Sequence, residues 1–146
     1  MTIPFTSDAE IIAIGEGVVA GTLPKPAWTH AAHFAAAVYL VAGQSDLVAE
    51  RDMPGLIRAY NTATGVANTD SEGYHETITL ASLRAVRSFV ASLPDGDAPL
   101  FMICNRLLAT DLGKRDWLLA YWSRERLFSA AARRAWVEPD LQPLLF

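Results

Sequence analysis

The stretch WTHAAHFAAAVYLVA, residues 28–42, decides the fold class. Small or apolar residues fall on every side of the helix that this stretch would form. A helix that is apolar all round lies at the centre of a domain. Thr29 can cap its first turn and Gly43 can end it. We therefore expect a central helix over residues 29–43, with other helices packed around it.

Capping residues and turns divide the rest of the chain into further helices. Ser7 can cap a first helix that ends at Gly21, and Ser129 can cap a short one near the end of the sequence. Pro54 is expected to kink or split its helix, because proline lacks the backbone donor. The helices that we expect beside the central one are 8–20, 45–65, 73–93, 99–112, 114–124 and 130–136. The sequence thus predicts an all-α fold, a compact bundle of six or seven helices.

The chain has 146 residues, enough for one domain with a core of its own. We expect residues 1–146 to form a single helical domain, with the proline-broken apolar tail 137–146 packed back on it. Hydrophobic residues make up 51% of the chain and charged residues 19%, which excludes disorder and allows for a homo-oligomer interface. The single cysteine, Cys104, cannot form an intramolecular disulfide, and its apolar surroundings are typical of a core helix.

Composition also bears on location and partners. No apolar run reaches the roughly 18 residues that cross a bilayer. The first residues, MTIPFTSDAE, lack the features of a signal peptide, so we expect a cytoplasmic protein with no membrane partner. The net charge of −4 disfavours nucleic acid, whose binding depends on clustered Lys and Arg. A small molecule is then the partner that we expect.

The three histidines are the candidate site residues. His30 and His33, three apart, share one face of the central helix, and His75 heads the inward face of the helix expected over 73–93. Unpaired backbone N–H groups in a first helical turn favour neutral imidazoles. Three neutral imidazoles can bind one divalent metal, such as zinc, iron or nickel, and leave a position open for a substrate. We therefore expect His30, His33 and His75 to converge, with a metal-dependent enzyme acting on a small molecule as the leading hypothesis.

Two other interpretations of these histidines stay open. They can form a metal-free acid–base or ligand-binding pocket, or they can be core residues that only donate and accept hydrogen bonds in a structural or oligomeric protein. The H-E-x-x-H, P-loop, G-x-S-x-G and paired C-x-x-C motifs are all absent. The choice among the three interpretations therefore needs the geometry.

Two neighbours of His75 are candidate proton donors or acceptors, namely Tyr74 and Glu76. Glu76 lies about 100° from His75 around an ideal helix, so adjacency in sequence does not place the two in one site. An acidic residue in a first turn also stabilises the helix, which is an alternative role for Glu76. Tyr74 can instead pack where the helix begins.

Four further residues are candidates for binding a substrate. Arg58 and Asn61 lie three apart on the helix expected over 45–65, and a guanidinium there can bind a carboxylate. A surface ion pair is the alternative for Arg58. Trp28 can form a wall beside His30, and Thr79, one turn beyond His75, can orient an imidazole or bond to its own backbone.

Three segments resemble a functionally uncharacterised family of small bacterial proteins. They are WTHAAHFAAAVYL, IRAYNTATGVANTDSEGYHETIT and YWSRERLFSAAARRAWVEPDL, and together they cover well over half of the chain. The resemblance implies a shared fold and places His30, His33, His75 and Glu76 in motif positions, but it implies no activity. The chain is more loosely similar to the DinB and YfiT-like helical bundles, a resemblance that implies a divalent metal on three histidines.

Overall fold

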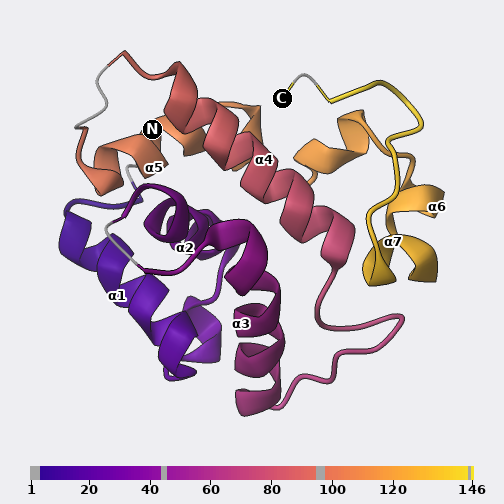
Figure 1. The fold of residues 1–146 in the computed structure, drawn as a ribbon, viewed down its shortest axis with the longest axis horizontal. Helices are drawn as coiled ribbons and strands as arrows, with labels where there is room; N and C mark the ends of the chain where they lie inside the picture. Colours follow the sequence, from indigo (N-terminus) through magenta and orange to yellow (C-terminus); the bar gives the residue numbers. More distant parts are fainter. Residues whose placement is uncertain (1–3, 44–45, 95–97, 145) are drawn as a thin grey trace.

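The structure is a computed structural model that describes residues 4–43, 46–94, 98–144 and 146. Over these residues it contains seven α-helices, three short 3₁₀ segments and no strand, so the predicted all-α fold is confirmed (Figure 1). The α-helices are α1 (Asp8–Ala20), α2 (His30–Ala42), α3 (Ala49–Ala63), α4 (Glu76–Ser92), α5 (Leu100–Leu108), α6 (Arg124–Leu127) and α7 (Ala130–Arg134). The 3₁₀ segments are η1 (Lys25–Ala27), η2 (Asp111–Gly113) and η3 (Trp117–Ala120).

Helix α2 lies at the centre of the bundle, as predicted. It packs against α1, α3, α4 and α5, and its residues from Phe34 to Val38 are all buried. Its alanines keep the helix narrow, so neighbouring helices approach closely. At Gly15 of α1, a methyl group would come within 2.3 Å of the Tyr39 ring of α2.

Local capping chemistry sets the helix ends that the sequence predicts best. Gly21 follows α1 with a φ of 72°, a conformation that glycine adopts at no steric cost. The side chain of Thr29 accepts the Ala32 N–H at 3.2 Å, and Ser129 accepts the Ala132 N–H at 3.1 Å. These short-range signals confirm the expected starts of α2 and α7.

Two expectations about the middle of the chain need correction or adjustment. Helix α3 runs through Pro54 without a break, so this proline does not split the helix, which packs against α1, α2 and α4. Its expected start at Ser45 lies outside the described residues. Helix α4 begins at Glu76 rather than near Gly73, because His75 adopts an extended backbone and caps the helix.

The helix expected over 114–124 does not form. The chain instead makes η3 and then starts α6, because Ser123 has an extended backbone and its hydroxyl accepts the Arg126 N–H at 3.2 Å. The preceding helix α5 also ends earlier than expected, at Leu108. A cap at Ser123 is incompatible with a helix that continues through it.

The tail lies against the segment 121–123. The carboxylate of Asp140 accepts both the backbone N–H and the hydroxyl of Ser123, at 2.7 and 2.6 Å. The Leu141 N–H donates to the Tyr121 carbonyl at 2.9 Å, and the indole of Trp122 donates to the Val137 carbonyl at 3.0 Å. These bonds hold α6 and the tail in one unit.

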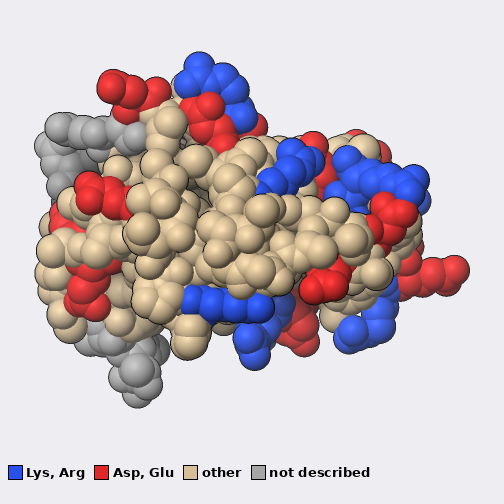
Figure 2. All heavy atoms as spheres, turned by 90° about the horizontal axis from the view of Figure 1, so that it is seen from below, with Lys and Arg blue, Asp and Glu red and all other residues tan. Residues whose placement is uncertain are grey.

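The surface charge is uneven. Residues 1–80 carry three Lys or Arg against nine Asp or Glu. In Figure 2 the side of the molecule where α1 lies shows red side chains without blue ones, whereas blue and red mix over the rest of the face. None of the helices formed by the described residues combines the length and apolarity that crossing a bilayer requires.

Candidate functional site

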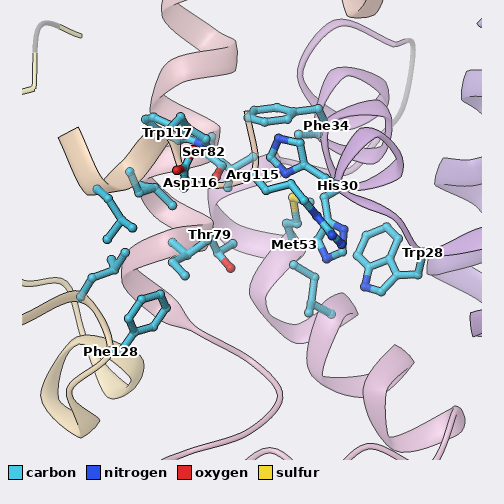
Figure 3. Close-up of a pocket in the computed structure, with 18 of the residues that line it drawn as sticks. Trp28, His30, Phe34, Met53, Thr79, Ser82, Arg115, Asp116, Trp117 and Phe128 are labelled. Carbon is cyan, nitrogen blue, oxygen red and sulfur yellow. The ribbon is translucent and has the colours of Figure 1, made fainter. Parts of the chain in front are cut away.

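A cavity of about 430 Å³ lies among α2, α3, α4, the segment 115–119 and α6 (Figure 3). Most of its lining is apolar, with Phe34, Ile57, Leu83 and Trp117 contributed by four different elements. Phe128, which follows α6, is 49% exposed and marks a side where the cavity opens to solvent. The polar members of the lining are His30, His33, Thr79, Ser82, Arg115, Asp116 and Arg124. An apolar cavity with a few polar groups is typical of a small-molecule site.

His33 is held in one tautomer by its own helix. Its Nδ1–H donates to the Thr29 carbonyl at 2.7 Å, so in the neutral ring Nε2 is left as an acceptor. The imidazole stacks on Trp28, with ring centroids 3.7 Å apart, and His33 as a whole is exposed to solvent. Packing against protein lowers the pKa of His33 below 6.5, and the nearby His30 lowers it further, although the Thr29 carbonyl partly offsets both. His33 is therefore neutral at neutral pH, with Nε2 able to accept a proton.

His30 is the first residue of α2 and is oriented by a different element. Its Nε2–H donates to the Leu112 carbonyl of η2 at 2.9 Å, which leaves Nδ1 as the acceptor of the neutral ring. The edge of the ring contacts Phe34, with centroids 5.3 Å apart. The expected pairing of His30 and His33 in one site is thus present, and each imidazole keeps one nitrogen unbonded to any described residue.

His75 is separate from this pair. It lies at the start of α4 and is not among the cavity-lining residues. Its Nδ1 accepts the Ile78 N–H at 3.1 Å, and its Nε2–H donates to the Leu127 carbonyl at 2.7 Å. Burial lowers the pKa of His75, the Leu127 carbonyl raises it and the charge of Arg133 lowers it again. Both ring nitrogens form hydrogen bonds with backbone groups, so His75 stabilises the junction between α4 and α6.

The expected convergence of three histidines is consequently not formed. Over the described ranges, no group of three or more His, Cys, Asp or Glu side chains is arranged to hold a metal ion. The physical reason is local, because His75 acts as an N-cap and turns back over its own helix instead of pointing along a helical face.

Tyr74 and Glu76 form a second polar group, outside the cavity lining. The Tyr74 hydroxyl donates to Glu76 at 2.5 Å, and the guanidinium of Arg58 lies 4.2 Å from the centre of the Tyr74 ring. Burial and the bond to Glu76 raise the pKa of Tyr74. A buried phenol with a raised pKa that is already bonded to a carboxylate is a stable structural arrangement. The structure thus brings Arg58, Tyr74 and Glu76 together, but not with His30 and His33.

Asn61 also has a structural role, in holding the loop between α3 and α4. It is buried, and its side-chain amide donates to Asn68 at 3.0 Å. The same Asn68 oxygen accepts the Tyr74 N–H at 3.0 Å. These bonds fasten the loop between α3 and α4 and leave Asn61 away from the cavity lining. Of the expected substrate-binding residues, Trp28 and Thr79 line the cavity, whereas Arg58 and Asn61 do not.

Several lining residues were not predicted from the sequence. Arg115, Asp116 and Arg124 belong to the segment that was expected to be a single helix, so their positions could not be inferred. Met53 on α3 carries no signal that separates it from an ordinary core residue. Ser82 could have been found, because it follows Thr79 at helical spacing on the inward face of α4.

Comparison of the chain with protein-family models, with curated proteins and with solved structures gives no match. The chemistry of the cavity itself is therefore the basis for a functional proposal.

Proposed function

We propose that this protein binds a small molecule in the cavity among α2, α3, α4 and α6, with His33 as the acceptor of a proton or hydrogen bond. The observation that carries the proposal is a neutral imidazole in the lining of an apolar cavity of about 430 Å³, whose Nε2 bonds to none of the described residues. That volume lies in the lower part of the range of about 300–1,000 Å³ for small-molecule sites. The ligand is accordingly a compact molecule rather than a large cofactor.

The surroundings of His33 suit a general base. The stacked Trp28 ring and the Thr29 carbonyl fix the orientation of the imidazole, so little rotational freedom is lost when a ligand binds. Its lowered pKa keeps Nε2 unprotonated near neutral pH. His30, with its own unbonded Nδ1, can accept a second hydrogen bond from the same ligand.

A fragment screen by two-dimensional NMR tests the proposal. We expect compact, largely apolar fragments to shift the resonances of Trp28 and Trp117, which both line the cavity. Ala37→Phe should abolish these shifts, because Ala37 lines the cavity and a benzyl group there would fill part of it. Ala13→Phe, on the exposed face of α1, is the matched control and should bind fragments normally.

Two outcomes would contradict the proposal. One is a screen in which no fragment shifts a lining residue, and the other is fragment binding that persists in Ala37→Phe. If Ala37→Phe does not fold, as judged by its melting curve, Ser82→Leu reduces the same cavity from a half-buried position on α4.

A divalent metal on His30 and His33 is a second candidate, favoured by the two unbonded ring nitrogens one turn apart. The described residues supply no third ligand, so the residues present do not fit a complete three-histidine site. Elemental analysis of untagged protein tests this candidate directly. One equivalent of zinc, iron or nickel, with a melting temperature that falls on chelation, would support it. Trace metal with an unchanged melting temperature would eliminate it.

A further inference from the structure

Two arginines in the cavity lining form no ion pair with a carboxylate of any described residue. Arg115 lies between η2 and η3, and Arg124 is the first residue of α6. Neither forms an ion pair with another residue in the described part of the chain, whereas Arg87 and Arg134 bind Glu50 and Asp70. Both arginines are exposed as well as lining the cavity, so an anion bound by either guanidinium would lie between the apolar wall and solvent.

Figure 3 shows where Arg115 and Asp116 lie in the cavity lining. The side chain of Arg115 extends toward His30 and Trp28. Among the described residues that line the cavity, Asp116 is the one carboxylate, and it lies beside Ser82 and away from that end of Arg115. The lining therefore carries two fixed positive charges and one negative charge, in a chain whose net charge is −4.

The rest of the cavity lining determines which chemical groups suit the part of the ligand that does not contact the arginines. Beyond the arginines, the cavity is walled by aromatic and branched aliphatic side chains such as Phe34, Trp117 and Phe128. Arg124 itself stands over the Phe128 ring, at 5.7 Å from its centre. A ligand that matches both parts has a compact apolar body and one anionic group. A carboxylate balances the net positive charge of the lining, whereas a phosphate dianion would make the occupied cavity net negative.

We propose that the cavity binds small organic monocarboxylates with an aromatic or branched apolar body, whose carboxylate is bound by Arg115. This inference rests on the proposed small-molecule function and names its ligand class. The guanidinium fork can donate two parallel hydrogen bonds to a carboxylate, a geometry that a neutral or cationic group cannot use. His33 then faces the carboxylate end of the ligand, where its Nε2 can accept a proton from solvent and donate it in a hydrogen bond to the carboxylate.

Three probes that share one body separate the contributions of charge and shape. Naphthoate, naphthylmethanol and naphthylmethylamine share the naphthalene ring system and carry an anionic, a neutral and a cationic group near neutral pH. We expect titration calorimetry to show naphthoate binding about tenfold more tightly than naphthylmethanol, with the amine weakest. Arg115→Gln should remove the preference for naphthoate and leave the affinity for naphthylmethanol unchanged.

Arg106→Gln is the matched control, because Arg106 is exposed on α5, lies outside the cavity lining and carries the same charge. It should change neither affinity. Equal affinities of the wild type for naphthoate and naphthylmethanol, or an equal loss in Arg106→Gln, would overturn the monocarboxylate inference while the small-molecule function stands. Tightest binding of the amine would do the same. Binding of none of the three probes would overturn both proposals.

Discussion

Replacing His75 tests whether this imidazole is structural. In His75→Ala the N-cap of α4 is lost, which costs about 1 kcal/mol of unfolding free energy. The buried carbonyl of Leu127 also loses its donor, at a further cost of about 1–3 kcal/mol. We therefore expect a total loss of about 2–4 kcal/mol. His75→Asn should lose less, because its side-chain oxygen can still accept the Ile78 N–H although it cannot reach Leu127.

The pH dependence of stability gives this prediction a second measurement. Burial holds the pKa of His75 in the folded protein below the 6.5 of the unfolded chain. As the pH falls below about 6.5 the unfolded chain binds more protons, so the free energy of unfolding decreases. His33 contributes in the same direction. In His75→Asn the slope should be smaller by up to about 1.4 kcal/mol per pH unit, the value for one proton.

Urea denaturation followed by circular dichroism, at pH values above and below 6.5, measures both quantities. His75→Ala and His75→Asn are compared with the wild type at each pH, since the difference between the two variants isolates the cap. A loss below about 0.5 kcal/mol in His75→Ala, the size of an ordinary surface effect, would refute the structural role. An unchanged pH slope in His75→Asn would show that this imidazole is not held neutral by its two backbone bonds.

Two further predictions concern α1 and α2. The imidazole of His33 should be the Nδ1–H tautomer near neutral pH, because its ring donates to the Thr29 carbonyl, and its pKa should lie below 6.5, because the ring is packed against protein. Nitrogen NMR measures both the tautomer and the pKa. The Nε2–H tautomer, or a pKa above 6.5, would contradict the assigned geometry. Gly15→Ala should destabilise the protein by about 1–2 kcal/mol in a thermal melt, because the clash of its methyl group with the Tyr39 ring outweighs the gain of about 1 kcal/mol in helix propensity. The same substitution in a Tyr39→Ala background should be neutral or stabilising, and an equal loss there would show that the ring is not the cause.

The parts of the fold that could be predicted depend on chemistry within a few residues. Gly21 and Thr29 mark helix ends through backbone conformation and capping, and the alanine-rich composition of α2 indicates its central position. The segment 114–124 could not be predicted in this way. Its residues are compatible with a helix, but the cap at Ser123 and the bonds from the tail select 3₁₀ turns instead.

The candidate site, like the fold, could be predicted only in part. His30 and His33 share a face because their spacing matches one helical turn, and the cavity includes both. His75 was misplaced because helix phase applies only inside a helix, and histidine is an uncommon N-cap. Arg115 and Arg124 join the site through packing between distant segments, which leaves no trace in local sequence spacing.

The walls of the cavity do not emerge from the ribosome together. Helices α2, α3 and α4 carry much of its apolar surface, whereas the opposite wall, residues 115–128, is synthesised later. At about 5–20 residues per second, the delay between Leu83 and Phe128 is on the order of 2–9 seconds. During that interval the nascent chain exposes an apolar surface that neither ligand nor protein covers. The side of the cavity that is synthesised first is thus without its opposite wall for this period, and exposed apolar surface of this kind is prone to aggregate.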